Sequence, residues 1–255
     1  MFYACATPLW EGFDEYVAVA SLDSIASASV LPPVQPVLSR EIESSLRTVP
    51  LPRGLAGSVP AAINHDEFWR LPEQARVKRS AALREIPTEW RTQPGIVAAM
   101  GDARRAPLYF WLMRPVYSMI GGNQLVDRVF ILRILNVLIA SFAIPFAYLL
   151  ALEVLEDVAA ALCATAALAA MPQVMMNIAH VGSEPLSLLM ATALALAAIR
   201  VQKATPPVLF GVLLGLALLT EAHFILLPAA CVLAARHWRP ALVIAVIGVS
   251  AYAVA

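Results

Sequence analysis

Apolar runs separated by short charged clusters fill the second half of the chain, whereas polar residues dominate the first half. A helix needs about 20 apolar residues to cross about 30 Å of hydrocarbon. We therefore predict membrane helices at these stretches: 131–152, 158–171, 186–199, two short legs within 206–235, and a last span after residue 240. Thr220, Glu221 and His223 interrupt the fourth stretch, so we place the turn of a hairpin there. Arg133 lies near the start of the first span, where it is expected to snorkel to the interface.

The first part of the chain predicts shorter elements. Residues 16–29 are typical of a helix of small residues. A Pro-rich region then extends to about residue 105, with one surface helix within 63–86 that Pro72 breaks and Pro87 stops. Residues 107–122 carry several aromatic side chains, a composition that favours the membrane interface; the alternative is a buried helix.

Together these elements predict an all-α fold, a polytopic transmembrane helical protein with a large, partly helical outer loop. Residues 1–106 are the extracytoplasmic first loop with its surface helices. Residues 107–130 are the interfacial helix and the entry to the membrane, and residues 131–255 are a helical bundle of about five spans, the last of them truncated.

Composition strengthens this prediction. The chain is 60% hydrophobic and 14% charged, and 23 of its 36 charged side chains lie in the first 106 residues. Soluble domains carry about 25% charged residues, so an ordinary soluble enzyme is excluded. The 18 basic and 18 acidic side chains balance, which argues against nucleic acid as a partner. The three cysteines are far apart and indicate neither a disulfide framework nor a zinc site.

The basic residues of the short loops predict the orientation. Two basic pairs, Arg200 with Lys203 and Arg236 with Arg239, fall on one side if 206–235 is a hairpin. Lys and Arg favour the cytoplasmic side, so we expect a multi-pass protein of the cytoplasmic (inner) membrane with residues 1–130 and the loop 173–184 outside. The acidic loop at 153–157 then lies inside, which the rule tolerates because acidic residues contribute little to it.

The first candidate chemistry is the acidic pair Asp14 and Glu15. Carboxylates near a membrane boundary are expensive to desolvate, which raises their pKa and favours a functional reason for keeping them. Adjacent helical residues point about 100° apart, so only one of the two can face a given pocket. The alternative is helix capping, because acidic groups stabilise the positive end of a helix.

Four segments in this order resemble the GT-C superfamily of membrane glycosyltransferases: FDEYVAVA, PLYFWL, RILNVLIASFAIPFAYLLALEVL and GLALLTEAHFILLP. Protein O-mannosyltransferase and aminoarabinose-transferase type enzymes are the most similar members. The resemblance implies transfer of a sugar from a polyprenyl-phosphate donor to an acceptor at the outer face of the membrane. An aspartate of the first outer loop serves as base in that family, a role that falls on Asp14, with Glu15 beside it.

The resemblance implies a lipid-borne sugar donor and membrane lipid as partners. It implies no resident cofactor, and the superfamily is divided on divalent metals. Where members carry HPPLYY, this chain has Arg105, Ala106, Pro107, Leu108, Tyr109 and Phe110. Arg104 and Arg105 are therefore candidate phosphate contacts, or anchors of the following helix, and Tyr109 is a candidate substrate contact.

Two later segments add candidates for substrate binding. The family's GLALLTK ends here in Glu221 instead of lysine, a reversal that weakens phosphate binding; Glu221 and His223 contact the substrate or pair with each other. Asn177 and His180 lie in the outer loop that is expected to border the cavity, the alternative being a plain solvated loop. The trio at 65–67 predicts a helix start rather than a metal site.

Other interpretations stay open. The family's first helix has no counterpart before Asp14, so we expect this chain to be a fragment or a mis-started, early-terminated reading frame, and its activity alone stays an open question. A transporter or flippase subunit would need broken helices and polar residues along a pathway. A noncatalytic scaffold, or the remnant of a larger enzyme, is the third hypothesis.

Overall fold

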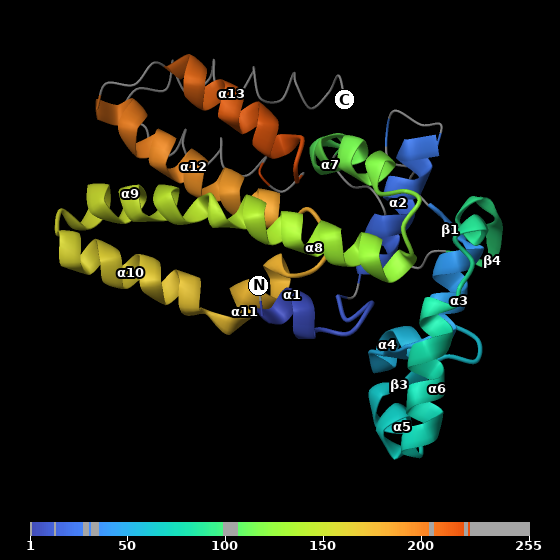
Figure 1. Cartoon of the computed structure of the whole chain (residues 1–255). Coiled ribbons are helices and arrows are strands. Elements are labelled where there is room, and N and C mark those ends of the chain that lie inside the picture. The colour runs from blue at the N-terminus through green and yellow to red at the C-terminus, as the bar shows by residue number, and fades with distance from the viewer. Residues whose placement is uncertain are drawn as a thin grey trace. The chain divides into compact units, whose positions relative to one another are not determined.

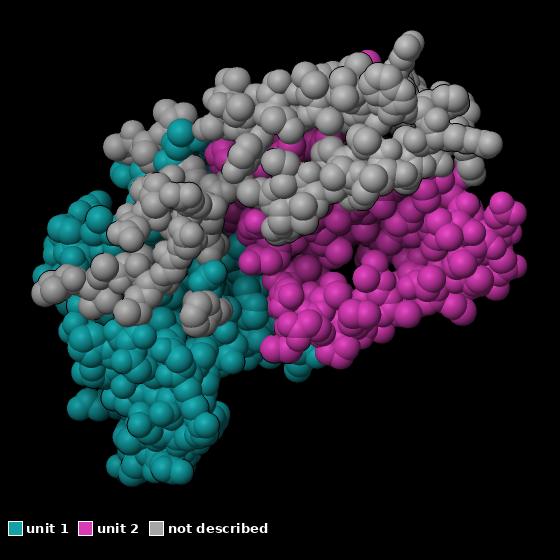
Figure 2. Space-filling view, turned by 180° about the vertical axis from the view of Figure 1, so that it is seen from behind, with its two compact units in different colours: residues 1–104, 110–135, 179–182 teal, residues 105–109, 136–178, 183–255 magenta. Residues whose placement is uncertain are grey.

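The computed structural model describes residues 2–12, 14–27, 31, 36–98, 107–203, 207–221 and 224. Helices predominate over these residues, which confirms the all-α prediction (Figure 1). The chain divides into two compact units (Figure 2). Unit 1 comprises residues 1–104, 110–135 and 179–182, and unit 2 comprises residues 105–109, 136–178 and 183–255.

Unit 1 combines short helices with two small sheets. Its helices before residue 104 are α1 (Phe2–Ala6), α2 (Glu15–Ser27), α3 (Arg40–Thr48), α4 (Arg53–Ala56), α5 (His65–Arg70), α6 (Glu73–Arg84) and the 3-10 helix η1 (Thr88–Thr92). Strand β1 (Val37–Ser39) pairs antiparallel with β4 (Pro94–Ala98), and β2 (Pro50–Leu51) pairs parallel with β3 (Ile63–Asn64). The helix predicted at 16–29 is confirmed as α2.

Helix α2 is buried almost all round and forms the centre of unit 1. Its apolar side chains are excluded from solvent together with those of α3 and the neighbouring strands, the fully buried members being Ala18, Val19, Leu22, Ile25, Leu38, Ile42 and Leu46. A helix that is apolar on every face must be covered on every face. This explains why small residues occupy α2, since Ala and Ser allow close approach of its neighbours.

The predicted surface helix within 63–86 is confirmed as α5 and α6, with Pro72 between them. Asn64 and Glu67 form a capping box at the start of α5, each side chain accepting from the other residue's backbone N–H. Asp66 pairs with Arg53, and His65 Nε2 lies 2.9 Å from a carboxylate oxygen of Glu11. The trio at 65–67 is thus a helix start, as predicted.

Helix α7 (Leu108–Met119) occupies the aromatic segment. The aromatic rings of Tyr109, Phe110 and Tyr117 are fully buried within the chain rather than exposed for a membrane interface. The Tyr117 hydroxyl donates to Asp23 Oδ1 over 2.9 Å, so its polar end has a protein partner. These three rings therefore pack inside the protein, while Leu112 and Met119 of the same helix are exposed, and the interfacial helix stays a prediction.

One continuous apolar helix runs from Leu125 to Leu155, formed by α8 (Leu125–Ser141) and α9 (Ala143–Leu155). Its 31 residues are long and apolar enough to cross a membrane. Helices α10 (Val158–Ala170) and α11 (Pro172–Ile178) meet the same test only as a pair, bent by 58°. Among the described residues these are the helices that qualify, by length and composition.

The expectation that Arg133 snorkels to the interface is wrong. Its guanidinium is buried, with a side-chain exposure of 5%, and it pairs with Glu15 of α2. A buried charge is stable only when it is paired and hydrogen-bonded. Arg133 finds such partners inside unit 1 because α8 begins there.

Unit 2 is a helical bundle. Helix α9 packs against α10 and α12 (Glu184–Lys203), and α12 packs against α13 (Pro207–Leu218), as Figure 1 shows. An apolar cluster joins α12 and α13, with Leu194, Ala197, Phe210, Leu214, Ala217 and Leu218 buried. The stretches predicted as membrane helices at 158–171 and 186–199 are confirmed as helices, α10 and α12, and their membrane-spanning role stays a prediction.

One difference from the prediction lies just after α10. The outer loop predicted at 173–184 begins with helix α11, because Pro172 provides the fixed φ that favours a first helical position. The stretch predicted as the first leg of the hairpin is helical, as α13, which ends at Leu218 before the predicted turn. The second leg and the last span lie outside the described residues.

A second buried ion pair joins α8 to α3. Arg128 Nη2 donates to Glu41 Oε2, and both side chains are almost completely buried. Arg128 Nη1 also donates to the Tyr117 hydroxyl over 3.3 Å. Burial, the largest influence, raises the pKa of Glu41 above its ordinary value of 4.5, although the charge of Arg128 opposes the rise.

This raised pKa predicts how stability depends on pH. A carboxyl whose pKa is higher in the folded state binds its proton more tightly there, so its contribution is fully present below pH 4.5 and is lost as pH rises through the raised pKa. Measured over this window, the free energy of unfolding of the wild type should fall relative to that of Glu41→Gln. A difference that stays constant with pH would contradict the prediction.

Candidate functional site

Asp14 stands at the start of the central helix of unit 1. Its backbone carbonyl accepts from the Ala18 N–H over 3.0 Å, which places Asp14 at the N-cap position of α2. The residue is partly exposed, whereas Glu15 and the following five residues are buried. Asp14 is therefore the member of the acidic pair at the surface of unit 1, where a bound molecule can reach it.

Glu15 faces inward and accepts hydrogen bonds from three segments. Its Oε1 accepts from Arg133 Nε at 2.7 Å and from the Val181 N–H at 3.0 Å. Its Oε2 accepts from Arg133 Nη2 at 2.6 Å and from the Trp10 N–H at 3.1 Å. Four donors thus surround one buried carboxylate, so Glu15 is held in a structural arrangement.

Arg133 uses its remaining donors on the turn before α2. Nη1 donates to the Thr7 carbonyl at 2.7 Å and to the Thr7 hydroxyl at 3.2 Å, and Nη2 donates to the Pro8 carbonyl at 2.8 Å. A guanidinium has five N–H donors, and with the two bonds to Glu15 all five have an acceptor. We call Glu15 and Arg133 with these partners the Glu15–Arg133 cluster.

His180 reaches this region from a turn far along the chain. Its ring packs on Gly12, so closely that a Cβ added to Gly12 would lie 2.8 Å from His180 Cγ. Burial, the largest influence, lowers the pKa of His180 below 6.5; the carboxylates of Glu15 and Glu11 oppose this, and the charge of Arg133 reinforces it. His180 is consequently neutral at pH 7, the form that accepts a proton.

Gly12→Ala should displace the His180 ring. The added methyl group meets Cγ, Cβ and Cδ2 of His180 at 2.8 to 3.1 Å, and these atoms belong to the inner part of the side chain, which cannot swing away alone. Such overpacking destabilises proteins by about 1 to 3 kcal/mol. Chemical denaturation should show this loss. Gly54→Ala is the matched control, since nothing lies within 4 Å of its added Cβ, and equal stability of both variants would contradict the expectation.

Among the sequence-predicted site residues, the structure brings Glu15 and the turn of His180 together, and Asp14 precedes Glu15 in the chain. Tyr109 and Glu221 belong to unit 2: the Tyr109 hydroxyl donates to Asn136 Oδ1 at 3.1 Å, and Glu221 accepts from the Ser183 hydroxyl. Asn177 is exposed on α11, where it accepts from Gln173. Three candidates lie outside the described residues: Arg104, Arg105 and His223.

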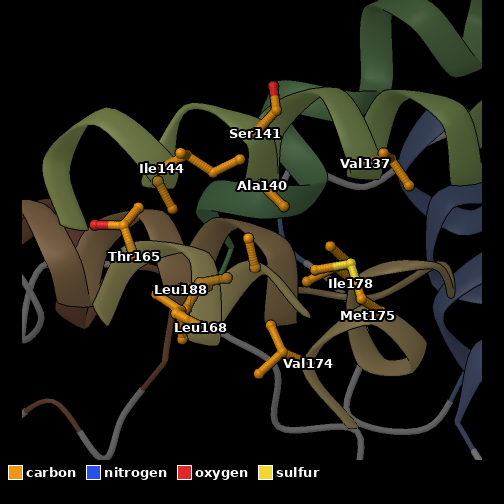
Figure 3. Close-up of a pocket in the computed structure, with 12 residues that line it drawn as sticks. Val137, Ala140, Ser141, Ile144, Thr165, Leu168, Val174, Met175, Ile178 and Leu188 are labelled. Carbon is orange, nitrogen blue, oxygen red and sulfur yellow. The ribbon is translucent and has the colours of Figure 1, made fainter. Parts of the chain in front are cut away.

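Unit 2 contains an apolar pocket of about 160 Å³ between α8, α9, α10, α11 and α12 (Figure 3). Its lining is almost entirely aliphatic, with Val137, Ile144, Leu168, Val174, Met175, Ile178 and Leu188 among the side chains. The two hydroxyls at the pocket, on Ser141 and Thr165, donate to carbonyls of their own helices. An apolar pocket of this size can take a hydrocarbon guest.

The described residues hold no group of three or more His, Cys, Asp or Glu side chains that could bind a metal ion.

Three members of the site were not predicted from the sequence: Trp10, Gly12 and Arg133. Gly12 and Trp10 carry no signal that separates them from other loop residues. Arg133 does carry one, because an arginine within an apolar helix needs a buried acidic partner.

No family model, no curated protein and no solved structure matches this chain. The chemistry open to the site is therefore inferred from the geometry of Asp14, Glu15 and His180.

Proposed function

We propose that the protein is a membrane glycosyltransferase that transfers a sugar from a polyprenyl-phosphate donor to an acceptor hydroxyl at the outer face of the membrane. The observation that carries this proposal is the joining of two distant turns beside one carboxylate. Asp14 lies at the start of α2, and the turn with His180 is fastened to the adjacent Glu15 by the Val181 N–H. A carboxylate and a neutral imidazole are the groups that general base chemistry uses.

In the proposed reaction the acceptor oxygen attacks the anomeric carbon of the sugar and inverts it. The new carbon–oxygen bond forms as the bond from that carbon to the phosphate oxygen breaks, and the leaving lipid phosphate keeps the electron pair. The Asp14 carboxylate takes the proton of the acceptor hydroxyl. A phosphate leaves without strong acid assistance, so one base is sufficient.

The apolar pocket of unit 2 suits the hydrocarbon chain of a membrane lipid. Nothing in its lining offers an uncommitted polar group, because both hydroxyls already donate within their helices. A pocket of this kind selects hydrocarbon and excludes polar molecules. We assign it to a hydrocarbon chain of the surrounding membrane lipid.

A polytopic arrangement in the membrane is part of the proposal. Large apolar side chains are exposed along α8, α9, α10 and α13, including Leu138, Phe142, Val154, Leu162, Val208 and Val212. Such a surface is unfavourable in water and favourable in lipid. Arg200 donates to Glu153 over 3.2 Å, so the acidic turn after α9 and the basic end of α12 lie at the same end of unit 2, as the proposed cytoplasmic placement of both requires.

The direct test is sugar transfer by the full chain reconstituted in liposomes, with a polyprenyl-phosphate donor labelled in its sugar. The label should move to a hydroxyl acceptor with the wild type and stay on the donor with Asp14→Asn. Equal rates of release by both proteins would remove Asp14 from the mechanism. Movement of the intact donor across the bilayer, undiminished in Asp14→Asn, would instead support a flippase.

A further inference from the structure

We propose that Arg133 is a positioning residue: through Glu15 it holds the turn before Asp14 and the turn of His180 in one fixed arrangement. The inference rests on the proposed function, because it concerns how that site is organised. Arg133 lies on α8, whereas the segments that it joins belong to residues 7–15 and 179–182. Its role is thus to align parts of the chain that no short connection links.

Every hydrogen-bonding group of the Arg133 and Glu15 side chains has a partner in the cluster. Arg133 donates five hydrogen bonds, and Glu15 accepts four, so both groups are committed on every side. A bidentate arginine and carboxylate pair fixes direction as well as distance. A lysine would keep the charge but has three donors, and it cannot reproduce this geometry.

The backbone is strained at Trp10, next to the site. Trp10 has φ of 65°, in the left-handed region that a bulky residue rarely occupies. Two hydrogen bonds hold it there: its N–H donates to Glu15 Oε2 at 3.1 Å, and its indole Nε1 donates to Ser45 Oγ at 2.9 Å. Strained residues persist where the surroundings over-determine them, which is typical of functional sites. Here the strain shapes the turn that leads through Gly12 to Asp14.

A hydrogen bond links the Glu15–Arg133 cluster to the turn of His180. Glu15 Oε1 accepts from the Val181 N–H at 3.0 Å, so the carboxylate that Arg133 orients also fixes the residue next to His180. Gly12 then receives the His180 ring in close contact. The guanidinium of Arg133 therefore fixes the turn before Asp14 and the turn of His180, although it does not itself contact the donor or the acceptor.

The test replaces the pair as a whole, with Glu15→Met and Arg133→Met in one protein. Buried ion pairs often tolerate replacement by apolar residues of similar volume, so this variant should fold, but it lacks the acceptors for the amides of Trp10 and Val181. The matched control is Glu41→Met with Arg128→Met, a second buried pair among the described residues, which joins α8 to α3. Each variant is assayed for kcat and KM of sugar transfer and for amide hydrogen exchange.

We expect kcat to fall by about 100-fold in the Glu15 and Arg133 variant with KM little changed, because small misplacement of reacting groups has effects of that size. The control should keep its kcat. Faster exchange at Trp10 and Val181 should accompany the loss and be absent from the control. An unchanged kcat, or equal losses in both double variants, would overturn the proposal.

An inactive wild type and an unfolded double variant each leave a decisive measurement. If the wild type transfers no sugar, the proposed function fails, and amide exchange alone decides whether the Glu15–Arg133 cluster orders both turns: unchanged exchange at Val181 would refute it. If the double variant does not fold, Arg133→Lys takes its place. Because lysine preserves the charge, the fold should survive while kcat falls by a smaller factor, and full activity of Arg133→Lys would refute the positioning role.

Discussion

Asp14→Asn should reduce the rate of sugar transfer by about 10² to 10⁴-fold, the usual contribution of a general base. Asparagine has nearly the same size and still accepts hydrogen bonds, but it cannot take a proton at neutral pH. The acceptor hydroxyl would then attack without losing its proton, which leaves a charged oxygen in the transition state. The loss should therefore appear in kcat, with donor binding little altered.

The backbone role of Asp14 makes this substitution a clean one. Asn and Asp are equally good at the N-cap position, and the carbonyl that accepts from Ala18 is unchanged, so α2 should remain intact. Thermal unfolding of Asp14→Asn should match the wild type within error. A loss of activity that comes with loss of folded protein would speak for capping, the alternative interpretation of this residue.

Arg133→Met should be among the most destabilising single changes in unit 1. It leaves the buried carboxylate of Glu15 without its counter-ion and the carbonyls of Thr7 and Pro8 without their donors. Removing one partner of a buried pair costs about 3 to 5 kcal/mol. Denaturant unfolding in mild detergent should show this loss, and a tendency to aggregate is expected if the total stability is of similar size.

A double-mutant cycle with Glu15→Met distinguishes the cost of the uncompensated Glu15 charge from the cost of the other lost contacts. If the uncompensated carboxylate causes the loss, adding Glu15→Met to Arg133→Met should recover most of it. The cycle would give a coupling energy near zero if the two groups contributed independently. Arg128→Met is the comparison, since Arg128 lies on the same helix as Arg133 and its loss leaves the buried carboxylate of Glu41 without its counter-ion.

The sequence predicted most helices because their signals are local. Pro72 separates α5 from α6 as expected, and the apolar stretch after residue 131 is a helix. The pair of short sheets was not foreseen, since two-residue strands such as β2 and β3 leave no alternation to detect. Helix α11 was missed because Pro172 was interpreted as an end, whereas it begins a helix.

The candidate site was partly predictable for a different reason. The acidic pair and His180 were candidates by residue type. The expectation that only one of the two carboxylates faces a given pocket stays a prediction; the structure shows Glu15 buried beside the partly exposed Asp14. The role of Arg133 depends on a contact 118 residues away, which no local pattern encodes. Its position in an apolar stretch favoured snorkelling, and only the tertiary structure supplied the buried partner.

The bond between Glu15 and the Val181 amide also sets the timing of biosynthesis. Its two ends are separated by 166 residues, so a nascent chain that has just released α2 from the ribosome has no partner for that carboxylate. At about 5 to 20 residues per second, on the order of ten seconds or more pass before Val181 emerges. Through that interval Glu15 must remain hydrated or held by other proteins, and unit 1 matures only after most of the later helices have been translated.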